Sequence, residues 1–175
     1  YNWIYTKDNI IWQRSMTRRA VALFSGGLDS TLAILTILKQ GIEVKAIKFQ
    51  TPFDPDLSDQ ALSSKDLFPV AEKFGFGIKL HRLGDKFLDM VKKPKHGYGK
   101  NMNPCIDCRI FMMKKAKAYM EETGASFIVT GEVLGERPMS QRRDSMRLIE
   151  KEAGLDGLIL RPLSAKLLPA SIPEK

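Results

Sequence analysis

Cysteine is scarce in this chain, and long apolar runs are missing. The 175 residues include two cysteines, Cys105 and Cys108, which lie too close together for the disulfide framework of a secreted domain. A reducing cytosol is the simplest compartment for such thiols. No apolar run approaches the roughly 18 residues that span a bilayer, and the N-terminus lacks a signal-peptide pattern. We therefore expect a cytoplasmic protein.

Two common nucleotide-binding motifs are missing as well. The chain has neither the Lys-Ser/Thr pair of a Walker loop nor a G-x-G-x-x-G turn. It has instead the segment LFSGGLDST, residues 23–31, between an apolar run at 19–24 and a segment of helical apolar spacing at 30–40. A strand-to-helix turn presents free backbone N–H groups and the positive end of a helix dipole. The segment therefore predicts an anion-binding site.

The residue types of this turn suit phosphate groups. Gly26 and Gly27 let the backbone approach a ligand closely. Asp29 would repel a bare phosphate, so we expect it to hold Mg²⁺ or to cap the helix. Hydroxyl donors come from Ser25, Ser30 and Thr31. The alternative is a Gly- and Ser-rich helix cap that binds no ligand.

Strand and helix patterns alternate along the chain, which predicts an α/β fold with a parallel sheet of about five strands. Parallel sheets bind ligands beyond the carboxyl ends of their strands, where the segments at Ser25, Gly131, Leu160 and Cys105 should meet. We expect residues 1–18 to be an arm or linker and 19–175 to be one domain, in a chain trimmed from a longer protein. Strands are predicted at 19–24, 42–49, 77–80, 125–131 and 158–163, and helices at 30–40, 67–74, 85–91, 108–123 and 145–152.

Positive charge is concentrated in two parts of the sequence. The formal net charge is +8, and the excess lies between 92 and 117 and between 137 and 147. This pattern predicts a polyanionic partner, nucleic acid first, although solvated helix faces are an alternative. The loop around His96 and Tyr98 is predicted to contact RNA by stacking or to form a lid. The candidate RNA-binding residues are Lys92, Lys93, Lys95, Lys100, Arg109, Arg142 and Arg143.

The two cysteines form the motif N-P-C-x-x-C at the expected start of a helix. A helix N-terminus and basic neighbours lower the pKa of a thiol, so we expect reactive thiolates at Cys105 and Cys108. Such a pair can carry sulfur or bind a metal. Half of a zinc site and two buried cysteines without a special role are the alternatives.

Three segments resemble one enzyme superfamily. Residues 25–30 are similar to the pyrophosphate loop (PP-loop) of the N-type ATP pyrophosphatases, and 103–108 resemble the N-P-C-x-x-C loop of tRNA sulfurtransferases. Residues 127–163 resemble the second half of the catalytic domain of 4-thiouridine synthetases and lack the His-Tyr pair of the 2-thiouridine branch. The matching positions are 130–132, 134–135, 140–141 and 161–163.

This resemblance implies a fold, a reaction and partners. The fold would be the three-layer sandwich of the adenine nucleotide alpha hydrolase type, binding ATP with Mg²⁺. A uridine oxygen of tRNA would be adenylated, and sulfur would then displace AMP. Sulfur would reside on Cys105 or Cys108, or on a [4Fe–4S] cluster with a third ligand outside this sequence, and Cys108 is expected to be the more sensitive to substitution. Partners would be tRNA, a sulfur donor (a cysteine desulfurase, a persulfide or sulfide), and a second copy or a companion RNA-binding chain.

The resemblance also assigns residues to roles. Asp29, Cys105 and Cys108 would be catalytic, and both cysteines would serve as metal ligands. Two other functions stay open: a related enzyme that adenylates a small molecule for sulfur or amine insertion, and a non-catalytic module that binds nucleotide and metal. The implied ATP-binding residues are Ser25, Gly26, Gly27, Asp29, Ser30, Thr31, Phe49, Gly131, Glu132 and Gln141.

Overall fold

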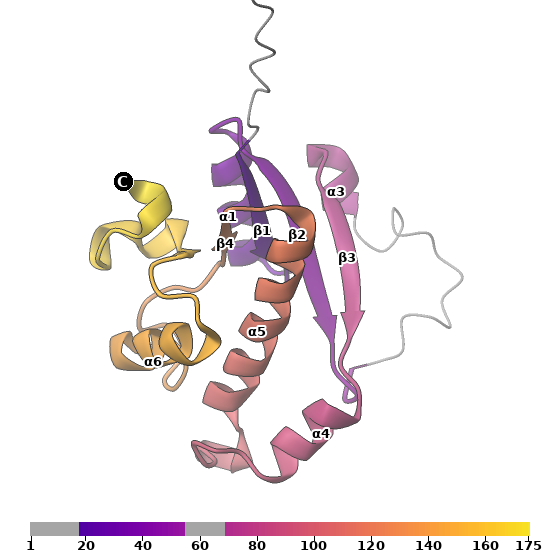
Figure 1. The fold of residues 1–175 in the computed structure, drawn as a ribbon, viewed down its shortest axis with the longest axis vertical. Helices are drawn as coiled ribbons and strands as arrows, with labels where there is room; N and C mark the ends of the chain where they lie inside the picture. Colours follow the sequence, from indigo (N-terminus) through magenta and orange to yellow (C-terminus); the bar gives the residue numbers. More distant parts are fainter. Residues whose placement is uncertain (1–17, 55–68) are drawn as a thin grey trace, which may run out of the picture.

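A parallel β-sheet forms the centre of the molecule (Figure 1). The computed structural model describes residues 18–54 and 69–175. Within them the sheet has five strands in the order β3-β2-β1-β4-β5, all parallel. The predicted α/β class is therefore confirmed. The strands are β1 (Arg19–Leu23), β2 (Glu43–Gln50), β3 (Gly77–Arg82), β4 (Phe127–Val129) and β5 (Ile159–Leu160).

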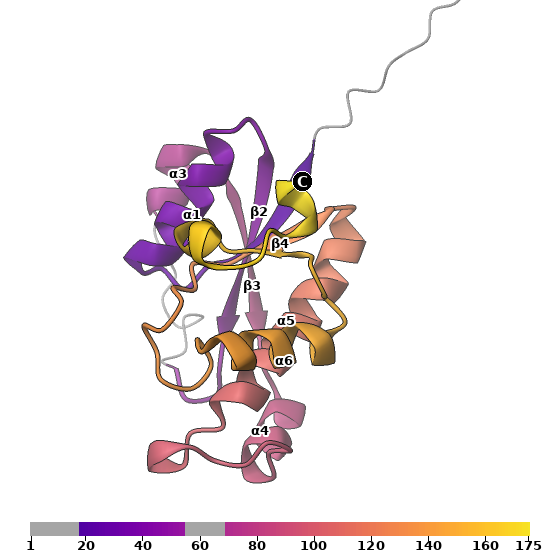
Figure 2. The same cartoon turned by 90° about the vertical axis from the view of Figure 1, so that its left-hand side faces the viewer.

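Helices cover both faces of the sheet, as the two views in Figures 1 and 2 show. Side chains of α1 and α3 belong to the hydrophobic cluster on one face, and those of α5 and α6 to the cluster on the other. This arrangement confirms the predicted three-layer sandwich. The helices are α1 (Leu28–Leu38), α3 (Pro69–Phe74), α4 (Asp85–Lys92), α5 (Cys105–Thr123) and α6 (Arg143–Ala153), with 3₁₀ turns at Lys100–Met102, Pro162–Leu167 and Ile172–Glu174.

The central strand β1 explains why the apolar run at 19–24 has no polar positions in its middle. Side chains alternate between the two faces of a strand, and a parallel sheet is covered on both. Ala20 and Ala22 pack in the cluster beneath α1, whereas Val21 and Leu23 pack in the cluster beneath α5. All four are buried.

The strand order reverses at β1, and this reversal positions the site. The chain runs from β1 to β2 and β3 on one side and then returns to place β4 on the other side of β1. Leu23 pairs with Ile47 of β2, and Ala22 pairs with Val129 of β4. Ligands of open parallel sheets bind at such a reversal, beyond the carboxyl ends of the two strands. Segments that are far apart in sequence, such as those of Ala22 and Val129, thus meet between β1 and β4.

Several predicted boundaries differ from the observed ones. Helix α5 begins at Cys105 rather than at 108, directly after Pro104, a residue that favours helix starts. The last strand is two residues long because Pro162, which cannot donate to a ladder, starts a 3₁₀ turn. The arm predicted at 1–18 and the start of the helix predicted at 67–74 lie largely outside the described residues. Within those residues, no helix is both long and apolar enough to cross a bilayer.

Candidate functional site

A cavity of about 690 Å³ lies beyond the carboxyl ends of β1, β2 and β4. Its walls come from the 25–30 turn, the end of β2, the first turn of α5 and the 131–141 loop. The predicted convergence of Ser25, Gly131 and Cys105 is confirmed, whereas the segment after Leu160 lies behind the wall. The predicted site residues that line the cavity are Ser25, Asp29, Ser30, Phe49, Cys105, Cys108, Arg109, Gly131, Glu132 and Gln141.

The 25–31 turn is held in shape by its own hydroxyl groups. Gly27 is the centre of this bonding: its amide donates to Ser25 Oγ at 3.2 Å, and its carbonyl accepts from Ser30 Oγ and Thr31 Oγ1 at 3.0 and 2.9 Å. Gly26 has a φ of +90°, a conformation that side chains disfavour. From β2, Lys48 Nζ donates to the carbonyl of Ser25 at 2.7 Å. The hydroxyls thus shape the turn before any ligand arrives.

The N-terminus of α1 is open to a ligand. Gly27 is its N-cap residue, and no side chain caps the helix. The first amides of a helix have no partner within it, so they can donate to an anion. Asp29 lies inside the first turn and lines the cavity. The expectation that Asp29 caps the helix is therefore wrong, and a role towards a cation stays a prediction.

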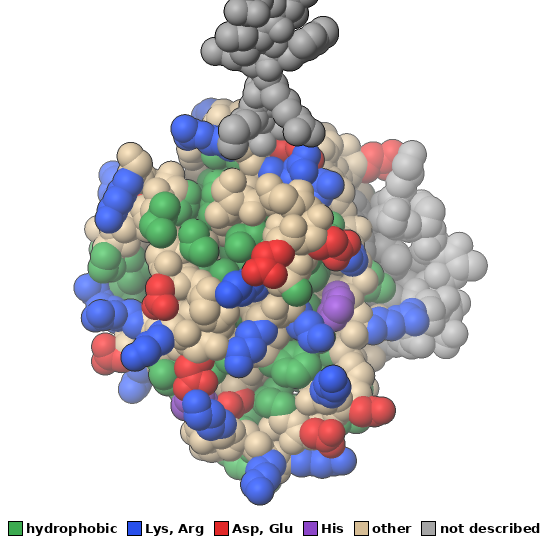
Figure 3. Space-filling view, viewed as in Figure 1, with side chains coloured by type: hydrophobic (Ala, Val, Ile, Leu, Met, Phe, Trp, Pro, Cys, Tyr) green, Lys and Arg blue, Asp and Glu red, His purple; other side chains and the backbone are tan. Residues whose placement is uncertain are grey.

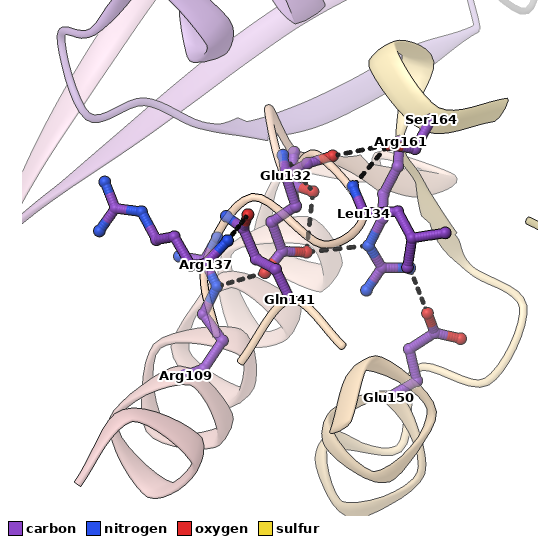
Figure 4. A network of polar contacts seen from close by, with 9 residues as sticks. Arg109, Glu132, Leu134, Arg137, Gln141, Glu150, Arg161 and Ser164 are labelled. Carbon is purple, nitrogen blue, oxygen red and sulfur yellow. Dashed lines mark hydrogen bonds and ion pairs between the residues drawn. The ribbon is translucent and has the colours of Figure 1, made fainter. Parts of the chain in front are cut away.

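A buried ion-pair network supports the part of the cavity wall that Glu132 and Arg109 form (Figure 4). Glu132 is almost fully buried, with Oε1 accepting from Arg109 Nε at 2.7 Å and Oε2 accepting from Arg161 Nε at 2.9 Å. Thr130 Oγ1 donates to the same Oε2 at 3.1 Å. Arg161 also pairs with Glu150 of α6. The network thus joins α5, the end of β4, the segment after β5 and α6.

The electrostatics of this network keep Glu132 charged. Burial by itself would raise the pKa of its carboxyl, but Arg109 and Arg161 outweigh burial and lower the pKa to about 2. The pKa of Arg161 is raised above its ordinary value: burial opposes this, and the two glutamates prevail. Both carboxylate oxygens of Glu132 are engaged by arginines, which favours a supporting role over direct contact with ATP.

Gln141 likewise holds the wall in place. Its side-chain oxygen accepts from the Arg137 amide at 3.2 Å, and its backbone carbonyl accepts from the Gly135 amide at 2.9 Å. A third hydrogen bond joins the 131–141 loop to the segment after β5: the Ser164 hydroxyl accepts from the Leu134 amide at 2.9 Å. ATP contacts by Glu132 and Gln141 stay predictions.

The cysteine pair faces the same cavity from the first turn of α5. Both thiols are free and partly buried. Burial raises the pKa of Cys108, an effect that Arg109 partly offsets and Cys105 reinforces. The expected lowering of the pKa is therefore wrong for Cys108, because loss of hydration outweighs the helix terminus and the nearby positive charge.

The donor groups in the cavity suit Mg²⁺, whereas a [4Fe–4S] cluster with a ligand outside this sequence stays a prediction. Asp29 supplies a carboxylate in the first turn of α1 at the cavity, a position that suits Mg²⁺ shared with phosphate groups. A [4Fe–4S] cluster is held by about four thiolates, and this sequence has two cysteines. Among the described residues, no third cysteine, histidine or carboxylate joins the pair to form a metal-binding group.

The loop at residues 93–104, before the cysteines, is held by hydrogen bonds to α5 and α6. His96 lies between two carboxylates, with Nδ1 3.0 Å from Asp107 Oδ1 and Nε2 3.1 Å from Glu152 Oε1. Burial would raise the pKa of Asp107, but hydrogen bonds from His96 and Lys95 keep it below its ordinary value. Lys95 Nζ also binds Glu152, at 2.7 Å. The expectation that His96 stacks on RNA or belongs to a mobile lid is not favoured by these contacts.

The remaining candidate RNA-binding residues lie on the surface. Lysine and arginine side chains on the face in Figure 3 are interspersed with acidic and apolar ones. Arg109 differs because it is paired with Glu132 inside the cavity, and Arg143 donates to the Leu167 carbonyl at 2.9 Å. RNA binding by this set stays a prediction. Its exposed members are Lys92, Lys93, Lys95, Lys100, Arg142 and Arg143.

Sequence reasoning missed the supporting residues of the site. Lys48 looked like a polar position of an alternating strand, and Arg161 was noted within a motif without a role. One pattern could have pointed to Arg161: a charged residue directly after a short apolar strand requires a buried partner. No sequence pattern predicts the roles of Glu150 and Ser164, because their partners Arg161 and Leu134 are distant in sequence.

Comparisons with known proteins agree with this geometry. The family model for the thiamine biosynthesis protein (ThiI) matches residues 15–166. A probable tRNA sulfurtransferase of Caldanaerobacter subterraneus subsp. tengcongensis is 32% identical over 146 residues, covering 83% of this chain and 36% of that protein. One from Lysinibacillus sphaericus is 35% identical over 146 residues, covering 83% and 34%. The chain thus spans about a third of the length of these relatives.

Solved structures give the same result. A crystal structure of a 4-thiouridine synthetase–RNA complex with bound ATP aligns with a TM-score of 0.64 and 28% identity, covering 83% of this chain and 36% of that one. A predicted subunit of a tRNA methyltransferase from Methanocaldococcus jannaschii shares the fold, with a TM-score of 0.54 and 20% identity over 83% of this chain and 67% of that one. The extent of the family match decides the assignment, and this chain belongs to the ThiI family.

Proposed function

We propose that this chain contains the ATP-using catalytic domain, residues 19–175, of a tRNA sulfurtransferase. One observation carries the proposal: an uncapped helix N-terminus that suits phosphate and a pair of thiols line the same cavity. Activation of an oxygen and delivery of sulfur require these two kinds of group side by side. The names of the relatives, probable tRNA sulfurtransferases, support the same reaction.

ATP would bind with its phosphates on the 25–31 turn. The amides of the first turn of α1 donate to phosphate oxygens, and the positive φ of Gly26 lets the backbone approach them. The adenine ring lies against the end of β2 near Phe49, which lines the cavity. Asp29 would hold Mg²⁺, which supplies charge neutralisation for the pyrophosphate that leaves.

The reaction would proceed in two displacements. A carbonyl oxygen of uridine attacks the α-phosphorus, the bond to the β-phosphate breaks, and pyrophosphate departs. The terminal sulfur of a persulfide on one cysteine then attacks the activated carbon, and AMP leaves. The second thiol attacks the inner sulfur, which releases thiouridine and leaves Cys105 and Cys108 as a disulfide to be reduced. These steps need two thiols, which Cys105 and Cys108 supply.

The partners of this reaction are a tRNA and a sulfur donor. The uridine has to leave its stack to enter a cavity of this depth. The exposed lysines and arginines at 92–100 and 142–143 would bind the phosphate backbone. A second copy or a companion chain would strengthen binding of the RNA. A desulfurase or a persulfide would transfer its outer sulfur to one thiol, whereas sulfide would form the persulfide by opening the Cys105–Cys108 disulfide left by the previous turnover, which releases the other thiolate.

The decisive experiment follows AMP, pyrophosphate and modified nucleosides together. We expect the full chain, given ATP, Mg²⁺, tRNA, a reductant and a cysteine desulfurase with its substrate cysteine, to release AMP and to form thiouridine detectable by mass spectrometry. Omission of tRNA should abolish AMP release. Release that is indifferent to tRNA would instead indicate a small-molecule substrate, and nucleotide binding without any release would indicate a non-catalytic module.

A further inference from the structure

Asp107 lies between the two cysteines in the first turn of α5, and its carboxylate binds the loop that precedes the helix. Oδ1 accepts from the Lys95 amide at 3.2 Å, and Oδ2 accepts from the His96 amide at 2.9 Å. The His96 ring adds a third contact, with Nδ1 3.0 Å from Oδ1. The Asp107 side chain is 8% exposed. The buried carboxylate thus joins the first turn of α5 to residues 95 and 96.

The first turn of α5 needs support from outside the helix. The first amides of a helix have no partner within it, and the N-cap residue, Pro104, makes no side-chain cap. The Cys108 amide donates to the Pro104 carbonyl at 2.9 Å and so closes the turn. In the connection from residue 96, Asn101 and Met102 have φ values of 58° and 56°, an uncommon and strained conformation for residues with a side chain. The turn that carries both thiols would therefore shift if its contact with the loop were lost.

The His96 ring extends this contact to α6, because Nε2 lies 3.1 Å from Glu152 Oε1. Burial would raise the pKa of Asp107, but hydrogen bonds from His96 and Lys95 keep it below its ordinary value. The hydrogen bond from Lys95 lowers the pKa of Glu152. Both partners are therefore carboxylates, which only accept, so both ring nitrogens donate and the ring is an imidazolium in this arrangement. One side chain, 17% exposed, thus bridges the start of α5 and the end of α6.

We propose that His96 is a positioning residue for sulfur transfer, because it holds the turn of α5 that carries both thiols at the cavity wall. This inference rests on the proposed function. In the last step of that reaction the second thiol attacks the inner sulfur, the Cys105–Cys108 disulfide forms, and thiouridine leaves with the electron pair of the broken S–S bond. The attack needs the sulfur atoms in contact and in line, and a misplacement of about 1 Å can slow such a step about 10²-fold. Adenylation takes place at the 25–31 turn and should not need His96.

The test separates adenylation from sulfur transfer in a single turnover. It uses the full chain with ATP, Mg²⁺, tRNA, a reductant and a cysteine desulfurase with its substrate cysteine. Pyrophosphate reports adenylation, and thiouridine reports sulfur transfer. His96→Ala should release pyrophosphate at the parental rate and form thiouridine about tenfold or more slowly. His96→Gln, which keeps one donor group in the side chain, should give an intermediate rate of thiouridine formation.

Arg19→Ala is the matched control for a loss of stability that leaves the site intact. It removes a hydrogen bond to the Thr123 carbonyl and an ion pair with Glu43, at the other end of α5. Its ratio of thiouridine to pyrophosphate should equal that of the parent. Hydrogen exchange of the Cys108 amide should rise in His96→Ala and stay at the parental rate in Arg19→Ala, because only the first variant releases the first turn of α5.

Thiouridine formation at the parental rate in His96→Ala would overturn the inference and leave the proposed function standing. Slow release of pyrophosphate by this variant would also overturn it, because His96 would then act in RNA binding or adenylation. Should His96→Ala fail to fold, His96→Gln decides by the same two rates. A parent that releases pyrophosphate and forms no thiouridine would overturn the proposed function and this inference together.

Discussion

Gly131 lies directly against the first turn of α1: a Cβ atom added to it would come within 2.5 Å of the backbone nitrogen of Ser30. The carbonyl oxygen of Asp29 would be 2.7 Å away. Both are backbone atoms of a helix, so neither can rotate out of the way. This contact joins the end of β4 to the turn after β1 and sets the depth of the cavity between them.

Substitution of Gly131 by alanine should therefore displace the turn. We expect Gly131→Ala to lose ATP binding and to be destabilised by about 1–3 kcal/mol, the cost of overpacking. Gly77→Ala is the matched control, because a Cβ there meets open space. Calorimetry and thermal unfolding measure both effects, and normal ATP affinity in Gly131→Ala would contradict the packing argument.

Asp29 is expected to act on the nucleotide rather than on the fold. Asp29→Asn should reduce AMP formation on the order of 10²-fold, as for other electrostatic groups of a transition state. Its thermal midpoint should stay near that of the parent, because the carboxylate caps nothing. Asp89→Asn, on the exposed face of α4, provides the control. AMP formation at the parent rate would exclude a role in holding Mg²⁺.

The cysteines are expected to matter after adenylation. Cys105→Ser and Cys108→Ser should each still bind ATP and yet form no thiouridine, because a serine hydroxyl cannot carry a persulfide sulfur. Mass spectrometry of tRNA nucleosides measures the product. Thiouridine at parental levels in both variants would leave the pair without a role in sulfur transfer.

The thiol of Cys108 is expected to react slowly, because burial raises its pKa and so lowers the fraction of thiolate at pH 7. In the Cys105→Ser variant, Cys108 should therefore react with iodoacetamide more slowly at pH 7 than free cysteine does.

Acid should unfold the protein partly through Glu132. Its pKa in the folded protein is about 2, below the ordinary value of 4.5, so the unfolded chain binds the proton more readily. The resulting stabilisation, roughly 3 kcal/mol, is complete above pH 4.5 and is lost as the pH falls towards 2. Denaturant titrations from pH 6 to 2.5 should show this slope in the parent. A Glu132→Gln variant with the same slope would contradict the assignment.

His96 should stabilise the loop that leads to the cysteines. His96→Ala removes contacts to Asp107 and Glu152, and we expect a loss of about 1–3 kcal/mol because both partners are charged. Lys95 binds the same Glu152 but is 70% exposed, so Lys95→Ala should cost less than about 1 kcal/mol. Hydrogen exchange across residues 93–104 should rise in the first variant. Similar exchange rates in His96→Ala and Lys95→Ala would contradict the stabilising role of the His96 contacts to Asp107 and Glu152.

Most helices and strands, and the parts of the site that are contiguous in the chain, could be predicted from the amino-acid sequence. Apolar spacing is set by neighbouring residues, so the strands around Val21 and Ile47 and the helix after Cys105 were predictable. The 25–31 turn was recognisable because all its residues are contiguous. The meeting of the segments at Ser25, Gly131 and Cys105 could also be predicted, because the carboxyl ends of parallel strands share one edge of the sheet.

The pairing of the buried charges became visible in the folded molecule and could not be predicted from the sequence. Arg109 and Glu132 are 23 residues apart, and Arg161 and Glu132 are 29 apart, so no local pattern pairs them. Their contact requires β4 to lie between β1 and β5 and α5 to cross the same end of the sheet. The raised pKa of Cys108 has the same origin. Hydration depends on everything that packs around a side chain, whereas a sequence displays only what lies beside it along the chain.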